Sequence, residues 1–426
     1  MKKIIGSFLI VTILLIASCS KVDENLEESI PVEANYKSQY TSASSPKYST
    51  RELIIQFKKN TPLRKKAALR QQFQVVDYEV CAHCDGTFEK WDFGPGIDLE
   101  NKFGSVSSGS GGAESIENVI IEFSFENDVE IPYLTGGTGN TYDTEHIASN
   151  NSNDNTVTIA VLDSGIDVHY PTFDSSPFLY DAAPLGIPGV YSGWDYVNED
   201  NNCYDDYIQV HGTAVSTMIY ESLNYAEVPF QLLPVKIADQ DGEVSIFNML
   251  CGMLFSLPKA DIVQISAGWY DDINANPFTT SVFLDLLSQY ENVLVVTSAG
   301  NSSNDNDGNI AHYPSNFSAM TSNVIAVGAT NEEVTDAAYF TNYGRNTVDF
   351  MSKGTNLPFV NTIGQSVPIS GTSFSAPLVT AVAAKLLYGS GMTYTPIEIK
   401  EQLDAGGIPV FYTKQTIYNK YITPLY

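Results

Sequence analysis

The chain has 426 residues, 43% of them hydrophobic, and a formal net charge of −28 at pH 7. This length and hydrophobic content predict a large buried core and two or three domains, which excludes an intrinsically disordered protein. The negative charge repels phosphates and anionic lipid head groups, so we expect no nucleic acid as a partner and no binding to a membrane surface by charge attraction.

The first residues have the pattern of an export signal, because two lysines precede an apolar run that is too short for a membrane-spanning helix. The run ends in Ile-Ala-Ser-Cys at Cys19, which resembles the lipobox of bacterial lipoproteins, where the cysteine becomes the lipid-modified first residue. We therefore expect a signal peptide over residues 1–18 and a lipid anchor at Cys19 as the only membrane attachment. The expected location is the bacterial cell envelope, on its periplasmic side or at the cell surface. An ordinary signal peptide with an incidental cysteine is the alternative.

A polar, flexible tether is predicted over residues 19–50, followed by a small α+β domain over residues 51–130. In this domain a strand-like ELIIQF and a helix-like PLRKKAALRQQF precede three further strand-like segments, VVDYEV, FEKWDF and NVIIEFSF. The Gly/Ser-rich run GSVSSGSGG at 104–112 is interpreted as a loop, and the turn-rich residues 131–150 as an exposed linker.

The cysteines do not define a function by themselves. Cys81 and Cys84 form a C-x-x-C pair, which is compatible with a redox pair, half of a zinc site or a short-loop disulfide. We favour a structural or incidental role for this pair, and an exported protein permits a disulfide. Cys251 lies in the apolar segment IFNMLCGMLFSL and is expected to be a buried thiol. Cys203 has no assigned role.

Residues 151–426 are predicted to form an α/β domain with a mainly parallel sheet. Five short apolar runs are typical of strands that are buried on both faces: TVTIAVLD, FQLLPVKI, DIVQISAG, NVLVVTSAG and NVIAVGAT. Helix-like segments such as GTAVSTMIYESL and SVFLDLLSQY alternate with them, so helices are expected to cover the sheet. In such sheets, functional residues gather at the carboxyl ends of the strands.

Four polar residues stand at predicted strand ends or helix starts of this domain: Asp163, His211, Asn301 and Ser373. Each has an ordinary explanation when taken alone, because aspartate and asparagine favour turns and serine caps helices. Their joint presence in one α/β domain is not explained by four independent structural roles. The set therefore favours a catalytic site.

At these motifs the chain resembles the subtilisin-like serine peptidases, or subtilases, over about residues 151–405. The matching motifs are VLDSGI around Asp163, HGT at His211, SAGN ending at Asn301 and GTSFSAP around Ser373, with ADIVQIS and FTNYG in support. The chain order Asp, His, Ser belongs to this family among the known triad folds. The resemblance implies a three-layer subtilisin-like fold and hydrolysis of peptide bonds.

The resemblance also implies a role for each residue type. Ser373 would be the nucleophile, His211 the base that takes its proton, and Asp163 the group that orients the imidazole and stabilises its positive charge. The Asn301 amide and the backbone N–H of Ser373 would stabilise the oxyanion. Val210 departs from the family pattern, because many members have glycine or another small residue before this histidine.

The walls of the family's main specificity pocket correspond to five small residues, and their size implies room for a sizeable substrate side chain: Ser266, Ala267, Gly268, Ala299 and Gly300. Many family members bind calcium, and the run at 304–308 is rich in ligand-type side chains. The run lacks the spacing and the distal glutamate of a loop-type calcium site. No metal is assigned, and no cofactor is expected to be required.

The α+β domain at 51–130 resembles the ferredoxin-like inhibitory propeptide of these peptidases, which acts as an intramolecular inhibitor. Residues 51–70 carry seven Lys or Arg against one acid, whereas residues 151–426 carry eight basic and 29 acidic residues. Because opposite charges favour docking, we expect the basic helix to face the acidic catalytic domain. The segment 125–134 would then lie along the cleft, with self-cleavage inside 131–150; a merely solvated basic face is the alternative.

These observations predict an exported, lipid-anchored serine endopeptidase that is made as an autoprocessed precursor and cuts protein or peptide substrates through an acyl-enzyme. The main alternative is a binding or adhesion lipoprotein that keeps the subtilase fold without turnover. A narrower alternative is a processing peptidase dedicated to one secreted precursor.

Overall fold

The computed structural model describes residues 46–108, 113–126, 147, 155–173, 177–182, 192–272, 277–361 and 364–426. The chain divides into two compact units, Met1–Ser38 and Gln39–Tyr426, and all described residues belong to the second. The predicted signal peptide, Cys19 and nearly all of the predicted maturation segment 131–150 lie outside the described residues. Within the described ranges no helix is long and apolar enough to cross a bilayer.

The N-terminal module, residues 46–126, is a ferredoxin-like α+β unit in which two helices cover one face of an antiparallel sheet. The predicted strands and the first helix are confirmed, and the sheet order is β2-β3-β1-β4. In chain order the elements are β1 (Lys47–Phe57), α2 (Leu63–Gln72), β2 (Asp77–Val80), β3 (Phe88–Asp92), α3 (Leu99–Ser107) and β4 (Ile116–Glu126).

Helix α3 corrects the expectation that residues 104–112 form a loop, because its last turn includes Gly104–Ser107. The Asp98 side chain caps the helix start by accepting a hydrogen bond from the backbone N–H of Asn101 at 3.0 Å. Val106 is buried in the core between the helices and the sheet. Capping and burial therefore outweigh the low helix propensity of glycine and serine in this turn.

The large domain, residues 155–426, contains a nine-stranded sheet whose strands are all parallel except at one edge. Its order is β17-β18-β14-β13-β11-β9-β5-β7-β6, with β17 the antiparallel strand. All five predicted strands are present and central. The strands are β5 (Val157–Asp163), β6 (Trp194–Asp195), β7 (Phe230–Lys236), β9 (Ile262–Ile265), β11 (Leu294–Ser298), β13 (Val324–Thr330), β14 (Phe350–Lys353), β17 (Ile408–Pro409) and β18 (Lys420–Tyr421).

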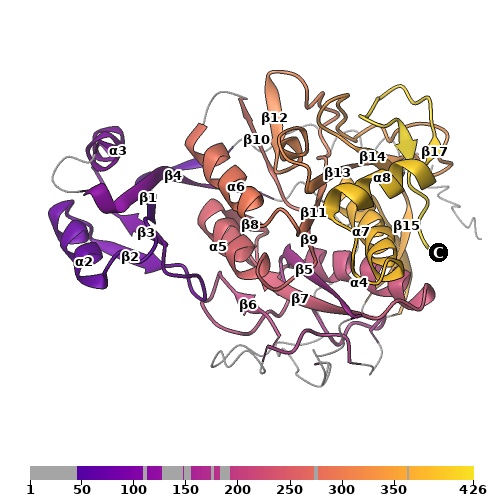
Figure 1. Cartoon of the computed structure of the whole chain (residues 1–426), viewed down its shortest axis with the longest axis horizontal. Helices are drawn as coiled ribbons and strands as arrows, with labels where there is room; N and C mark the ends of the chain where they lie inside the picture. The colour runs from indigo at the N-terminus through magenta and orange to yellow at the C-terminus, as the bar shows by residue number, and fades with distance from the viewer. Residues whose placement is uncertain are drawn as a thin grey trace, which may run out of the picture. The chain divides into compact units, whose positions relative to one another are not determined.

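Helices cover both faces of this sheet, which gives three layers (Figure 1). One core cluster contains α4 (His211–Tyr225), α7 (Thr372–Gly389) and α8 (Pro396–Gly406), and the other contains α5 (Ile246–Ser256) and α6 (Pro277–Gln289). The predicted three-layer α/β architecture with a mainly parallel sheet is therefore confirmed. Short elements complete the domain: β8 (Glu243–Ser245), β10 (Trp269–Asp272), β12 (Ile310–Tyr313), β15 (Leu357–Val360) and β16 (Ser366–Ile369).

The N-terminal module binds the large domain through its sheet. Strand β8 extends the module's sheet by pairing antiparallel with β4, with Phe125 opposite Val244. The helix-free face of the module packs on the large domain, because Ile54 and Phe125 belong to the core cluster that contains α5 and α6. The Phe125 ring lies 5.5 Å from the ring of Trp269. The contact is thus mainly apolar and supported by strand pairing.

This arrangement corrects the expectation that the basic helix faces the acidic domain. Leu69 of α2 packs with Leu53 and Ile55, whereas Ile54, on the opposite side of the strand, packs against the large domain. Two basic residues of α2 pair inside the module, since Arg70 lies 2.7 Å and Lys66 3.7 Å from the Glu89 carboxylate. Burial of the other sheet face, and not the charge on this helix, therefore determines how the module docks.

Glu122 is the buried acid at this contact. The Ser245 hydroxyl, which also caps α5, donates to Glu122 Oε1 at 2.8 Å, and Oε2 is buried without a hydrogen-bond partner among the described residues. Burial raises the pKa of Glu122 from its ordinary value of 4.5 to about 8, and the nearby Lys90 offsets part of this effect. Glu122 is therefore protonated in the folded chain at neutral pH.

In the parent chain, Glu122 should make the free energy of unfolding decrease as pH rises, and we expect Glu122→Gln to abolish this contribution. Between pH 4.5 and about 8 the folded chain keeps a proton that the unfolded chain has lost, so the free energy of unfolding falls as pH rises. The slope is about 1.4 kcal/mol per pH unit for one full proton. Urea unfolding of the parent chain and of Glu122→Gln at pH 5, 7 and 9 would measure it. Equal pH dependence with glutamate and glutamine at this position would contradict the prediction.

Candidate active site

Asp163 and His211 meet at the carboxyl edge of the sheet. Asp163 is the last residue of β5, and His211 is the first residue of α4. Asp163 Oδ1 lies 2.7 Å from His211 Nδ1, and both side chains are buried. A carboxylate accepts only, so Nδ1 carries the proton, and the lone pair of the neutral ring is on Nε2. The geometry thus selects one tautomer of the imidazole.

Two further groups hold the start of α4, and the sequence did not reveal either. Asp205 is buried, and its Oδ2 accepts from the backbone N–H of Thr213 at 2.9 Å and from its hydroxyl at 2.7 Å. The Ser164 hydroxyl accepts from the Gly212 N–H at 2.9 Å. Both satisfy N–H groups that a helix start leaves without partners. Asp205 carries no local signal in the sequence, because it lies in an irregular loop ahead of the helix.

Val210, the departure from the family pattern, has an unusual backbone. Its φ of 42° and ψ of 46° lie in the left-handed region, which a β-branched residue rarely adopts, and its side chain is fully buried. Burial of the side chain offsets this strain. The departure is thus accommodated by packing beside His211.

Ser373 is the second residue of α7, directly after Thr372 at the helix start. Its hydroxyl donates to the Ser266 carbonyl at 3.3 Å, and the Ser266 hydroxyl donates to the Ser373 carbonyl at 2.8 Å. The ring of the next residue, Phe374, lies 5.5 Å from the His211 ring. The structure therefore brings the start of α7 beside the Asp163–His211 pair.

Asn301 lies at the same place, in the loop after β11. Its Oδ1 accepts from both the backbone N–H and the hydroxyl of Thr372, each at 2.9 Å. These two donors fix the orientation of the amide, so the Nδ2 group points away from Thr372. Nδ2 lies on the side of Gly371, just ahead of Ser373. The amide is buried and held in one orientation.

Of the predicted pocket residues Ser266, Ala267, Gly268, Ala299 and Gly300, two contact the start of α7. Ser266 exchanges hydrogen bonds with Ser373, and the Gly300 N–H donates to the Thr372 hydroxyl at 3.2 Å. In the structure two of the five are small because of close packing. A Cβ at Gly268 would overlap the carbonyl of Tyr313, and one at Gly300, where φ is 101°, would overlap Asn342 and Tyr270. Room for a substrate side chain remains a prediction.

The polar run at 304–308 is engaged with protein groups. The Asp307 carboxylate accepts from the backbone and side-chain amides of Asn346 and from the Thr347 hydroxyl. Asn304 donates to Asn306 Oδ1 and to the Ile310 carbonyl. These contacts account for the composition of the run, and no calcium ligand set is assigned to it.

The fold and this arrangement define an α/β protein of subtilisin-like architecture. A cold-adapted subtilisin-like serine proteinase superimposes with a TM-score of 0.51 at 21% identity, covering 68% of this chain and 100% of that one. A lanthipeptide protease superimposes with a TM-score of 0.50 at 20% identity, covering 63% of this chain and 85% of that one. At these identities the likeness concerns the fold.

The family model described as "Subtilase family" matches residues 154–404, so the chain belongs to the subtilase family. The minor extracellular protease Epr of Bacillus subtilis (strain 168) is 30% identical over 258 residues, 58% of this chain and 34% of that protein. The cell wall-associated protease of the same organism is 26% identical over 299 residues, 66% of this chain and 30% of that protein. The chain thus spans about a third of the length of these two relatives.

Proposed function

We propose that the protein is a serine endopeptidase with Asp163, His211 and Ser373 as its catalytic triad. The observation that carries the proposal is the buried 2.7 Å contact between Asp163 and His211 beside the start of α7. Membership of the subtilase family and the similarity to two Bacillus proteases support the same reaction class.

In the proposed mechanism, His211 Nε2 takes the proton of the Ser373 hydroxyl as this oxygen attacks the substrate carbonyl. To do so, the hydroxyl must turn away from the Ser266 carbonyl, to which it donates at 3.3 Å. The imidazolium then returns the proton to the leaving amine, and an acyl-enzyme remains. Water activated by His211 hydrolyses this ester. Asp163 stabilises the imidazolium in both halves of the reaction.

The oxyanion would be stabilised by Asn301 Nδ2 and the backbone N–H of Ser373. The backbone N–H and the hydroxyl of Thr372 both donate to Asn301 Oδ1, so the side-chain amide is oriented before substrate binds. The N-terminus of α7 adds a positive partial charge at the same point. Such preorganised donors lower the barrier because they need no reorientation when charge develops.

We expect Asn301→Ala to lower kcat by about 10²–10³-fold with little change in KM, because the lost donor acts on charge that exists only in the transition state. Steady-state kinetics on a chromogenic peptide would measure both constants. Asn304→Ala is the matched control, since this amide in the same loop bonds to Asn306 and Ile310. Asn301→Ala kinetics within threefold of the parent would exclude Asn301 from oxyanion stabilisation.

The N-terminal module is proposed to be an intramolecular inhibitor that is removed by self-cleavage within 131–150. Its ferredoxin-like fold and its sheet contact with β8 support this role. Protein or peptide substrates are proposed on the basis of the family. We further propose export and lipid anchoring at Cys19, which places the enzyme in the bacterial cell envelope.

A fluorophosphonate probe tests the enzyme proposal. The self-cleaved protein, from which the inhibitory module has been removed, should become labelled on Ser373, as identified by peptide mass mapping, because the probe reacts with an activated serine. Pretreatment with the probe should also abolish cleavage of peptide substrates. A folded protein that stays unlabelled would instead support a binding or adhesion lipoprotein without turnover. Digestion of casein would separate a general protease from a peptidase dedicated to one precursor.

A further inference from the structure

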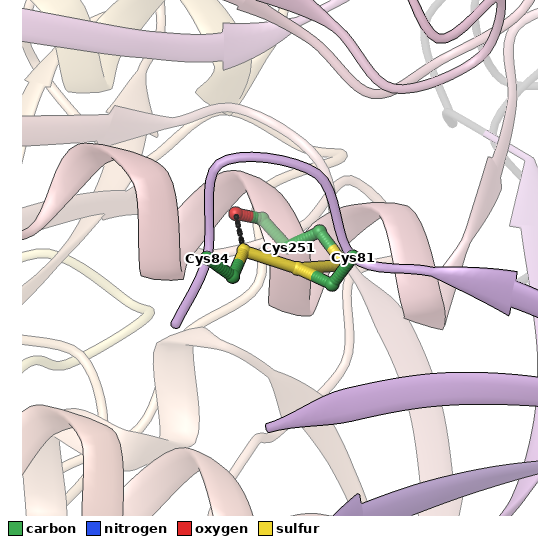
Figure 2. Close-up of side chains that lie close together, drawn as sticks. All are labelled: Cys81, Cys84 and Cys251. Carbon is green, nitrogen blue, oxygen red and sulfur yellow. Dashed lines mark hydrogen bonds between the residues drawn. A yellow bond between two sulfur atoms is a disulfide. The ribbon is translucent and has the colours of Figure 1, made fainter. Parts of the chain in front are cut away.

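Three cysteines from two parts of the chain form one cluster (Figure 2). Cys81 and Cys84 flank the turn between β2 and β3 of the N-terminal module, and Cys251 lies in α5 of the large domain. Their sulfur atoms all lie within 4.8 Å of one another. Cys81 has a disulfide contact with Cys84 and another with Cys251. Because one sulfur forms one disulfide at a time, these two contacts are alternative pairings, and either pairing leaves one thiol.

The backbone permits both pairings without rearrangement. The Cα atoms of Cys81 and Cys84 are 5.8 Å apart, and those of Cys81 and Cys251 are 5.6 Å apart. Both separations fall within the range of about 4.4–6.8 Å that disulfides span. A change of partner at Cys81 therefore requires side-chain movement only, while the N-terminal module stays docked.

The three sulfurs differ in their access to solvent. Cys81 and Cys251 are buried, whereas Cys84 is half-buried and lines a cavity of about 260 Å³ at the contact between the module and the large domain. Leu254 and Pro258 line this cavity from the large domain. Cys84 Sγ lies 3.3 Å from the Ala82 carbonyl and 3.7 Å from the Cys251 carbonyl. Cys84 is thus the cysteine that a small thiol or an oxidant reaches first.

A metal site is the competing explanation, because three thiolates are also ligands for zinc. A structural zinc site needs four ligands, and among the described residues no other His, Cys, Asp or Glu joins the three cysteines. The neighbouring His83 ring packs edge-on against Trp194, with centroids 4.1 Å apart. The arrangement therefore favours disulfide chemistry, which the proposed export also permits.

We propose that this cluster is a thiol–disulfide exchange site that controls whether the N-terminal module is covalently bound to the large domain. With Cys81 paired to Cys251 the two parts are cross-linked. With Cys81 paired to Cys84 the disulfide lies inside the module, and only non-covalent contacts hold the parts together. The free thiol is on Cys84 in the first form and on Cys251 in the second.

The exchange conserves atoms and electrons. The Cys84 thiolate attacks Cys81 Sγ, the bond from Cys81 to Cys84 forms, and the bond from Cys81 to Cys251 breaks. Cys251 leaves as a thiolate and takes up the proton that Cys84 released. Forming a disulfide from the fully reduced cluster requires a two-electron oxidant. We propose a disulfide of another protein in this role: it is reduced to a dithiol while two cysteine thiols of the cluster are oxidised to a disulfide.

The regulatory consequence rests on the proposed function. After the chain is cut between the module and the large domain, an inhibitory module paired through Cys81 and Cys251 would stay attached, and exchange to Cys84 would let it leave. Formation of the thiolate at Cys84, the most accessible sulfur of the cross-linked form, would then start release of the module from the peptidase. The exchange itself requires no peptidase activity.

The test protein is the full chain with two changes. Ser373→Ala makes the outcome independent of the proposed activity, and a recognition sequence for a site-specific protease is inserted between residues 126 and 155. After cutting, thiols are blocked and the fragments are separated on a denaturing gel without reductant. Cys84→Ser, which leaves only the Cys81–Cys251 pairing, should keep both fragments joined until reductant is added. Cys251→Ser and Cys81→Ser should give separate fragments. With all three cysteines present, the joined fraction should change on incubation with a glutathione redox buffer.

Separate fragments from folded Cys84→Ser would overturn the proposal. Should a variant fail to fold, peptide mass mapping of the chain with all three cysteines decides, because both cross-linked peptide pairs are expected. A single pairing, or stoichiometric zinc with three unoxidised cysteines, would overturn the exchange site. Fluorophosphonate labelling of the wild-type chain separately reports failure of the proposed enzyme function.

Discussion

Ser373→Ala is expected to lower kcat about 10⁶-fold, which is the size of the loss when a subtilisin of this family loses its nucleophile. The residual rate would come from substrate binding and the oxyanion donors, which need no serine hydroxyl. The same change should stop the chain from shortening itself. Peptide hydrolysis would measure the first effect after the N-terminal module is removed, by self-cleavage in the parent and through an inserted site for a specific protease in the variant. Intact mass spectrometry of the purified precursor would measure the second. The mass spectrum would also show whether Cys19 carries lipid and where the parent is cut.

The matched control is Ser375→Ala, two residues further along α7. Ser375 is also buried, and its hydroxyl donates to the Gly371 carbonyl at 3.4 Å. This substitution removes a buried hydroxyl from the same helix and should leave kcat within a few-fold of the parent. Unchanged turnover in Ser373→Ala would exclude Ser373 as the nucleophile. Equal losses in both variants would instead indicate damage to the start of α7.

The fold was predictable because its strongest signals are local. The five apolar runs of the large domain became β5, β7, β9, β11 and β13, since a parallel strand that is buried on both faces must be apolar throughout. Asp163 and Asn301 were predictable as site candidates, because each directly follows or ends such a run. Their convergence could be expected because the carboxyl ends of parallel strands share one edge of the sheet.

The features that sequence reasoning missed depend on contacts between distant residues. Asp205 acts on the start of α4 from an irregular loop, and no periodicity marks such a position. Cys251 was expected to be a simple buried thiol; the structure places it against Cys81, which is 170 positions away in the chain. The Gly/Ser run was assigned by composition, but its first turn is helical because Val106 is buried. In each case tertiary packing decided the outcome.

The charge argument for docking of the N-terminal module failed for a related reason. A count of charges along the chain does not say which face of a domain carries them. Lys66 and Arg70 form ion pairs with Glu89 inside the module. The sheet face that is buried against the large domain is the opposite one, which contains Ile54. The consecutive apolar residues Leu53, Ile54 and Ile55 bury both faces of β1, and this pattern does not say which face meets the large domain.

Asp163→Asn is expected to lower kcat by about 10⁴-fold, because the imidazolium of the transition state loses the carboxylate that stabilises it. The substitution can act by removing the negative charge or by reversing the imidazole tautomer, and the structure indicates that loss of the charge dominates. Asp163 Oδ1 accepts from His211 Nδ1 at 2.7 Å and also from the Ser164 N–H at 2.8 Å, so an asparagine keeps its oxygen at this position. The Nδ1–H tautomer is then retained, and the loss reflects the missing charge rather than a reversed imidazole.

Kinetics of Asp163→Asn and Asp163→Ala would separate the two effects. Loss of charge alone predicts similar reductions in kcat for both, whereas a reversed tautomer predicts a much larger reduction for asparagine. Asp205→Asn is the control for a buried carboxylate near the same helix, and its kcat should stay within about tenfold, because Asp205 holds the Thr213 backbone and hydroxyl and not the imidazole. An Asp163→Asn rate close to the parent rate would show that His211 works without a carboxylate, and the proposed triad would then be wrong.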